Sequence, residues 1–321
     1  MIRRKLAISI AALAALSLVI AACGSDSDGD DRMIFTPVAG EYSLQVISSD
    51  LGVGENRVVI GLLDQGGMPV AGADLSAQFY KVLENNEGEL VAEMDLEAIT
   101  IERSFTHLHD DGELHKHEVG ELGVYVAWVD FDTAGRWQVV VSGDVGDQIL
   151  EPTPFVFEVR EHTLSPAVGE PAPPSVQLTL DDVEDISEID TSVEPIPEMH
   201  SMTIAEAVSS GRPSVIIFAT PAFCVSQICG PTKEVVDQMY ERYGDRINFV
   251  HVEPYDVPRA RSGDCAPNLS VCIIPLLTDE WGLQSEPWVF TVDAEGLIAG
   301  KFDGVVGQSE LDEHLQALLA S

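Results

Sequence analysis

Two cysteines, Cys224 and Cys229, stand between a short apolar run and the start of a helical pattern. Residues 214–219 are mostly branched and apolar, which predicts a fully buried strand closed by a turn. Pro231 follows the cysteines, and because proline is favoured in the first turn of a helix, we predict that the helix begins near it. A helix N-terminus offers free N–H groups and a partial positive charge, which favour thiolate over thiol. The pair is therefore a candidate for thiol–disulfide chemistry.

The spacing of this pair constrains where each cysteine can lie. On an ideal helix, residues five apart have Cα atoms roughly 8.5 Å apart, beyond the ~7 Å limit for a disulfide. Cys224 must therefore lie in the loop before the helix, or the first turn of the helix must bulge, if the two sulfurs are to bond. Cys224 comes first along the chain and Cys229 lies nearer the helix, so the sequence leaves open which one attacks. A purely structural disulfide and copper ligation also remain open.

A second group of chemically active residues is His107, His109, His115 and His117, which flank an Asp-Asp-Gly turn. In a strand, side chains at i and i+2 share a face, so a hairpin could bring all four imidazoles together. Imidazole binds copper, zinc and nickel. A polar loop that happens to be rich in histidine is the alternative, and the lack of an accompanying methionine cluster weakens a Cu(I) reading.

The N-terminus has the pattern of a processing segment. A basic start, Arg3 to Lys5, precedes an apolar run at 6–20 that is short for a membrane span. Ile20 to Cys23 resembles a bacterial lipobox, and this resemblance implies cleavage before Cys23 and a lipid on its thiol. We predict a signal peptide at 1–22, a disordered tether at 23–33, and attachment to the bilayer on the extracytoplasmic face, where disulfides persist. A plain secretion signal is the alternative.

Four cysteines remain beyond Cys23, and Cys265 and Cys272 lie in an insertion after the second strand of the last domain. We expect a structural disulfide between them, which would stabilise the chain by roughly 2–3 kcal/mol. The alternative is a second dithiol that relays electrons to the first pair.

Charge excludes one class of function. The chain has 17 basic and 54 acidic residues and a formal net charge of −37. A phosphate backbone would be repelled, so nucleic-acid binding is not expected. The charge favours solubility, and a docking surface for a basic partner is the alternative.

Residues 34–161 read as strands and turns, which predicts an all-β sandwich of the immunoglobulin type. The predicted strands are Glu41–Ser48, Asn56–Leu63, Asp74–Val82, Gly123–Phe131, Arg136–Ser142 and Thr153–Arg160. The phrases at 53–57, 69–73 and 123–137 resemble the small extracytoplasmic domains called YtkA-like, which are often found beside copper-handling proteins. This resemblance implies copper as the metal of the histidine cluster. Trp128 and Trp137 are expected in the core.

Residues 162–199 are expected to form a linker. Six prolines stiffen it, and a run of acidic residues that includes Asp190 should keep it extended by mutual repulsion. One short β segment is predicted at Val176–Leu180.

The last domain, 200–321, is predicted to run helix, strand, helix, strand, helix, β-hairpin, helix. Its ranges are Thr203–Ser209, Ser214–Ala219, Thr232–Tyr243, Ile247–Val252, Leu276–Leu283, Pro287–Asp293, Leu297–Phe302 and a closing helix capped by Ser309. This order and the cysteine pair resemble the thioredoxin superfamily. The resemblance implies an α/β thioredoxin-like fold in which Pro287 is the cis-proline facing Cys224 and Cys229.

The chain departs from that family in having four residues between the cysteines where thioredoxin has two. The wider motif with Pro231 is similar to that of the Sco copper chaperones, which add a metal-binding histidine from a later loop. No clear equivalent is present here, since His251 falls within a predicted strand and is expected to be structural.

The sequence thus predicts a multidomain lipoprotein, an all-β immunoglobulin-like sandwich followed by an α/β thioredoxin-like domain. Its expected function is extracytoplasmic thiol–disulfide exchange with protein thiols and disulfides, with no cofactor required. The alternatives are a copper-binding or copper-delivery lipoprotein, and a thioredoxin-fold scaffold without catalysis.

Overall fold

The computed structural model describes residues 41–108, 114–224 and 228–320, with side chains outside 102–119. The predicted signal peptide, tether and lipidated Cys23 lie outside the described residues, as does His109. No helix in these ranges is both long enough and apolar enough to cross a bilayer.

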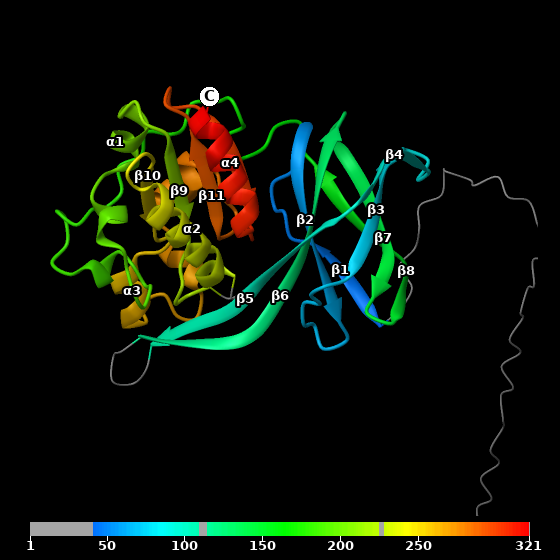
Figure 1. Ribbon diagram of the computed structural model, residues 1–321, viewed down its shortest axis with the longest axis horizontal. Helices are drawn as coiled ribbons and strands as arrows, with labels where there is room; N and C mark the ends of the chain where they lie inside the picture. The colour runs from blue at the N-terminus through cyan, green and yellow to red at the C-terminus, as the bar shows by residue number, and fades with distance from the viewer. Residues whose placement is uncertain (1–40, 109–113, 225–227, 321) are drawn as a thin grey trace, which may run out of the picture. The chain divides into compact units, whose positions relative to one another are not determined.

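The N-terminal part of the described chain is a sandwich of two four-stranded antiparallel sheets, with strand orders β1-β2-β6-β5 and β4-β3-β7-β8 (Figure 1). The strands are β1 (Tyr42–Val46), β2 (Gly54–Asp64), β3 (Asp74–Val82), β4 (Gly88–Asp95), β5 (Glu97–Leu108), β6 (Leu114–Phe131), β7 (Gly135–Val145) and β8 (Gln148–Val159).

The sheet that contains β6 is apolar on both faces. Tyr125, Ala127 and Val129 point into the core between the two sheets, while Val124 and Val126 belong to a second buried cluster on the outer face. This follows from the alternation of side chains along a strand. A sheet that is apolar on its outer face must be covered by something else.

The strand predictions were largely confirmed, and the one at Asp74–Val82 matches β3 at both ends. The structure adds β4 and the part of β5 before the histidines, neither of which was predicted from the sequence. Trp137 is fully buried as predicted, but the prediction for Trp128 was wrong, because its side chain is 49% exposed. Trp128 lies on the outer face of β6, one residue from the core-facing Val129.

The C-terminal part has a four-stranded sheet in the order β10-β9-β11-β12, in which β9 and β10 are parallel and the other neighbours are antiparallel. Its strands are β9 (Ser214–Phe218), β10 (Asn248–Val252), β11 (Trp288–Val292) and β12 (Ile298–Asp303). Its helices are α1 (Ile204–Ser209), α2 (Cys229–Tyr243), α3 (Val257–Ser262) and α4 (Gln308–Ala320), with short turns at η1 (Ile186–Glu188), η2 (Pro197–His200), η3 (Leu269–Cys272) and η4 (Leu276–Glu280).

Both faces of this sheet are buried. On β9, Val215 and Ile217 pack in one cluster with α2 and α4, while Ile216 and Phe218 pack in another with α1 and Trp281. Helices α2 and α4 cover the same face (Figure 1). Continuous apolar strands are expected when a sheet has both faces covered. The predicted order of strands was confirmed. Helix α3 was not predicted, the helix expected at Leu276–Leu283 is only the short η4, and Ser309 lies inside α4 and does not cap it.

Residues 162–199 were predicted to be an extended linker, and this prediction was wrong. The segment packs on the C-terminal sheet, and the N–H groups of Gly169 and Ala172 donate to the carbonyls of Ile298 and Gly296. Asp190, expected as a repelling surface charge, is buried. No strand forms at 176–180.

The outer face of the β6 sheet is covered by the C-terminal part. Ile228 and Val305 pack against its apolar residues, which are Val59, Ile99, Ile101, Leu122, Val124 and Val126. The buried guanidinium of Arg57 donates to Glu310 at 2.7 Å and to the Val305 carbonyl at 2.8 Å. The sandwich therefore contacts the residue that immediately precedes Cys229.

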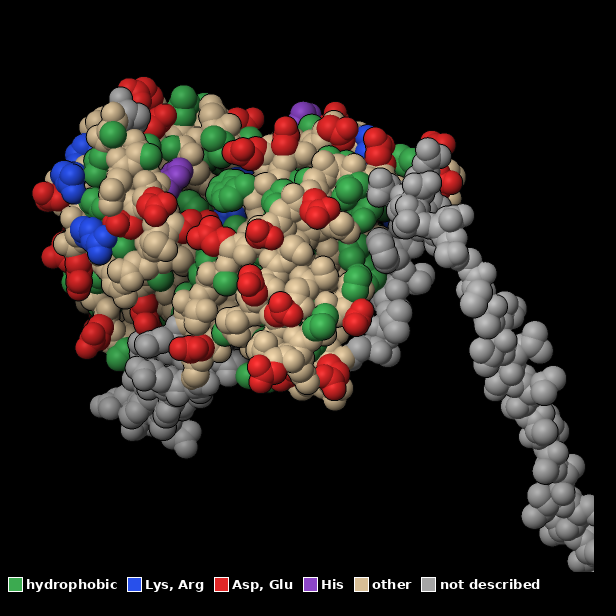
Figure 2. All heavy atoms as spheres, turned by 45° about the vertical axis from the view of Figure 1, so that its right-hand side comes forward, with side chains coloured by type: hydrophobic (Ala, Val, Ile, Leu, Met, Phe, Trp, Pro, Cys, Tyr) green, Lys and Arg blue, Asp and Glu red, His purple; other side chains and the backbone are tan. Residues whose placement is uncertain are grey.

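Acidic side chains are scattered over the face seen in Figure 2, and Lys and Arg occur at few places on it. This face has no basic patch of the kind that nucleic acids need.

Candidate functional site

Cys224 lies in the loop after β9, and its sulfur caps α2. Its own N–H donates to the Thr220 carbonyl at 3.2 Å, and its Sγ accepts the Cys229 N–H at 3.3 Å. Helix α2 begins at Cys229, two residues before the predicted Pro231, and Ile228 at the N-cap offers no side-chain acceptor. The sulfur thus occupies the place that a serine or aspartate oxygen usually takes. A thiolate there is stabilised by the N–H group and by the helix dipole.

Cys229 has the opposite environment. Its side chain is fully buried in the cluster formed by β9, α2 and α4, while Cys224 is partly buried against the same cluster. Burial, together with the neighbouring Cys224 sulfur, holds the pKa of the Cys229 thiol well above its usual value. Among the described residues, no disulfide includes either cysteine. The two sulfurs therefore lie close together but differ in access, since only Cys229 is fully buried.

Pro287 lies beside this loop. The Glu286–Pro287 peptide bond is cis, and the next residue, Trp288, pairs with Phe218 at the end of β9. The Pro287 carbonyl accepts the N–H of Gly304 at 2.9 Å, and a Cβ on Gly304 would lie 4.0 Å from Ile228. The proline and the cysteine loop thus meet at the same end of the sheet.

An acidic pair that the sequence reading missed accompanies them. The Tyr255 hydroxyl donates to Glu286 Oε1 at 3.0 Å. Burial raises the pKa of Glu286. Burial, then Glu286 and the two thiols, raise the pKa of Tyr255. The available signal was a glutamate directly before the predicted cis-proline.

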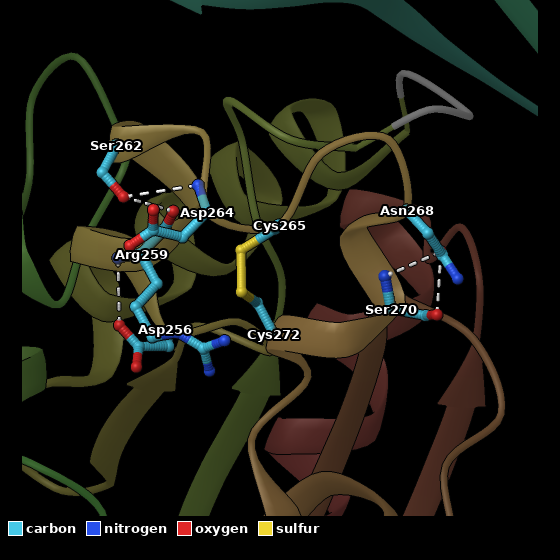
Figure 3. Close-up of a disulfide and its surroundings, with 8 residues drawn as sticks. All are labelled: Asp256, Arg259, Ser262, Asp264, Cys265, Asn268, Ser270 and Cys272. Atoms are coloured by element: carbon cyan, nitrogen blue, oxygen red, sulfur yellow. Dashed lines mark hydrogen bonds between the residues drawn. A yellow bond between two sulfur atoms is a disulfide. The ribbon is translucent and has the colours of Figure 1, made fainter.

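Cys265 and Cys272 are joined by a disulfide with Cα atoms 5.8 Å apart (Figure 3). The bridge closes the insertion between α3 and η3. Around it, Asp256 caps α3 through the Arg259 N–H, and Asn268 accepts the Ser270 N–H at 3.1 Å. Both cysteines are buried, so the bridge is sheltered from other thiols.

The backbone of the histidine segment forms the predicted hairpin between β5 and β6. His107 pairs with His115, and His117 pairs with Phe105. The metal site proposed for these histidines stays a prediction.

A second cluster of polar side chains, which was not predicted from the sequence, includes His251 of β10. Asp190 Oδ2 is 2.9 Å from His200 Nε2 and 3.2 Å from His251 Nδ1, and all three residues are buried. The three ligand atoms lie within 4.8 Å of one another, so these side chains could hold a metal ion. His251 was expected to be structural, and Asp190 was assigned to the linker. No local pattern links residues that come from three separate segments.

Charge within the cluster follows from this geometry. Burial opposes ionisation of Asp190, but the two histidines hold its pKa well below the usual value. Burial lowers the pKa of His200. For His251 burial acts in the same direction, yet Asp190 outweighs it and the pKa is raised. Nearby, burial raises the pKa of Glu253 to about 7.

No protein-family model matches the chain, and no curated protein matches it. Among solved structures, a thioredoxin-family thiol:disulfide interchange protein from Chlorobium tepidum is 16% identical, with 48% of this chain and 98% of that one covered and a TM-score of 0.30. A conjugative transposon lipoprotein from Bacteroides eggerthii is 11% identical, with 38% and 98% covered and a TM-score of 0.17. At these TM-scores neither likeness assigns a function to this chain.

The thioredoxin-like character of the C-terminal part rests on its own topology. Across the sheet the strands lie in the order β10, β9, β11, β12. Strands β9 and β10 are parallel, and β11 and β12 form an antiparallel hairpin. A helix that starts at a cysteine follows the first strand, and a cis-proline precedes the third.

Proposed function

We propose that this chain is a thiol–disulfide oxidoreductase in which Cys224 attacks and Cys229 resolves. The observation that carries the proposal is the hydrogen bond from the Cys229 N–H to the Cys224 sulfur at the start of α2. It favours the thiolate of the more exposed cysteine, while burial keeps the other cysteine as a thiol. Cysteines with a purely structural role would not need one partly exposed sulfur at a helix N-terminus and one buried sulfur beside it.

The reaction would proceed in two exchanges. The Cys224 thiolate attacks one sulfur of a partner disulfide, a mixed disulfide forms, and the other partner sulfur leaves as a thiolate. Cys229 then gives its proton to that thiolate and attacks the Cys224 sulfur. This breaks the mixed disulfide, and the second partner sulfur leaves as a thiolate that takes a proton from water. The partner has then gained two electrons and two protons and is a dithiol, and this chain is left with a Cys224–Cys229 disulfide. The reverse sequence would oxidise a partner.

The surroundings support a protein partner. Pro287 and Glu286 lie at the same end of the sheet as the cysteine loop, where the partly exposed Cys224 can meet the disulfide of a polypeptide. We propose a tethered location for this exchange, with Cys23 lipidated outside the cytoplasmic membrane. The lipobox-like sequence and the buried Cys265–Cys272 disulfide support it.

We also propose that the sandwich is immunoglobulin-like and serves to position the cysteine loop. Its orders, β1-β2-β6-β5 and β4-β3-β7-β8, correspond to strands ABED and CFG of that fold with one strand added beside C. The packing of Ile228 against its outer face supports the positioning role.

An insulin disulfide-reduction assay on the purified chain tests the function. We expect Cys224→Ser to abolish turnover, and Cys229→Ser to abolish turnover while accumulating a mixed disulfide that is visible on a non-reducing gel. Cys265→Ser/Cys272→Ser is the matched control and should retain turnover. Equal activity in the parent and in Cys224→Ser would refute the proposal.

Copper delivery is the second candidate, and the pairing of His107 with His115 across the hairpin favours keeping it. Replacement of the four hairpin histidines by alanine separates the two. Loss of bound copper with intact insulin reduction would assign the hairpin a role of its own. Loss of copper only in the Cys224→Ser/Cys229→Ser variant would assign copper to the cysteines.

A further inference from the structure

We propose that Asp190, His200 and His251 form a binding site for a divalent transition-metal ion of the zinc class, separate from both the cysteine pair and the histidine hairpin. The site would take two imidazole nitrogens and one carboxylate oxygen from the protein and leave one position open.

The spacing of the donor atoms fits such an ion. Tetrahedral zinc with bonds of about 2.0–2.2 Å places its ligand atoms roughly 3.3–3.5 Å apart. Asp190 Oδ2 is 2.9 Å from one histidine nitrogen and 3.2 Å from the other. These two oxygen–nitrogen distances therefore need to lengthen by only a few tenths of an ångström to accommodate the ion, and all three ligand atoms lie within 4.8 Å of one another.

The second nitrogen of His251 is already arranged as in a metal site. His251 Nε2 lies 2.9 Å from the Ala219 carbonyl, so it carries the proton and donates it there. Histidines that bind metals commonly fix their ring in this way. His251 Nδ1 then faces the Asp190 carboxylate at 3.2 Å, where the protonated ring donates to it. A bound cation would take the place of that proton.

The remaining charges leave room for a cation. Lys233 is buried nearby, but its Nζ donates to Asp237 at 2.7 Å, so its charge is paired. Glu253 adds a second buried carboxyl, which accepts hydrogen bonds from Thr191 through Oε1 and has Thr220 beside it.

A cavity lies beside the two histidines. It has a volume of ≈ 540 Å³ and is lined by His200, His251 and Glu253, together with residues of the 176–189 segment and of α3. The side chains of His200 and His251 are at most 1% exposed, so an ion would enter from this cavity only when they move. An ion with three protein ligands and one open position is the arrangement of catalytic zinc sites, whereas structural sites use four protein ligands.

The test uses the full chain with the other candidate ligands removed. The background variant carries Cys224→Ser, Cys229→Ser and alanine at all four hairpin histidines. After incubation with Zn²⁺ and gel filtration, we expect roughly one zinc per chain by elemental analysis. Adding Asp190→Asn, which keeps the shape of the side chain, should remove it, whereas Glu188→Gln at the rim of the same cavity should not.

Co²⁺ gives an independent readout, since a four-coordinate nitrogen and oxygen site shows visible absorption bands that disappear with His200→Ala. Zinc retained by the Asp190→Asn variant, or no zinc in the background variant, overturns the proposal. Should Asp190→Asn fail to fold by near-ultraviolet circular dichroism, the melting temperature of the background variant decides. A rise with Zn²⁺ supports the site, and no change refutes it.

Discussion

The chain holds two cysteine pairs in its C-terminal part, and they differ in almost every respect except their short spacing. Cys265 and Cys272 are both buried and bonded to each other. Among the described residues, Cys224 and Cys229 take part in no disulfide, and only Cys229 is fully buried. The comparison shows that separation along the chain does not decide whether a pair is structural or reactive.

What decides it is where each pair meets a helix. Cys224 faces the N-terminus of α2 and accepts one of its free N–H groups. Cys265 comes after α3, which ends at Gly263 with a φ of 83°. The positive end of a helix favours a thiolate, whereas the region beyond a helix C-terminus does not. The first pair therefore gains a nucleophile, and the second gains only a cross-link.

The largest expected difference is in alkylation of the reduced first pair in the folded chain. We expect iodoacetamide to modify Cys224 many-fold faster than Cys229, because burial both raises the pKa of the Cys229 thiol and excludes the reagent from it. Peptide mass mapping over time measures both rates. The same chain in denaturant should show nearly equal rates. Equal rates in the folded chain would contradict the assignment of Cys224 as the nucleophile.

Removing the second pair should act on stability and leave exchange intact. Cys265→Ser/Cys272→Ser should lower the free energy of unfolding by roughly 2–3 kcal/mol, as expected for a loop with a sequence separation of 7. Denaturant titration measures this loss, and insulin reduction should stay near the parent rate. A large drop in turnover with small loss of stability would instead make the second pair an electron relay.

Much of the reactive pair could be predicted from the sequence. The apolar run before Cys224 and the proline after Cys229 located the strand and the helix, because both signals are local. Pro287 was located from the order of elements. The start of α2 was placed two residues late, because the capping group is a sulfur and no ordinary N-cap residue marks the boundary.

Contacts between distant segments could not be predicted. Asp190 looked like one more charge in an acidic stretch, yet it is buried because His200 and His251 supply partners from other elements. Ile228 gave no sign that it would pack on the sandwich. The part of β5 before the histidines was missed because its sequence lacks the turn residues that should have separated it from β4. These features depend on tertiary structure, which a local pattern does not contain.

A smaller effect on stability is expected at Asp256, near the second cysteine pair. Asp256 caps α3, the helix that leads into Cys265, through the Arg259 N–H at 3.1 Å (Figure 3). Asp256→Ala should cost about 1 kcal/mol of stability, the usual value for a lost N-cap, and Asp256→Asn should restore most of it. Thermal denaturation measures the change. Slower insulin reduction in Asp256→Ala would show that the two pairs are coupled, contrary to the comparison.

The smallest expected effect concerns Glu286, whose charge raises the pKa of Cys229 in the first cysteine pair. Its carboxylate contributes to the raised pKa of Cys229, after burial and the Cys224 sulfur. Glu286→Gln should therefore make Cys229 a few-fold more reactive towards iodoacetamide, while alkylation of Cys224 changes less. Since burial raises the pKa of Glu286 itself, the gain should grow as the pH rises through that pKa and the parent carboxyl ionises. Exposed Glu295→Gln serves as the control. A gain that is the same at low and high pH would mean that the substitution acts through packing and not through charge.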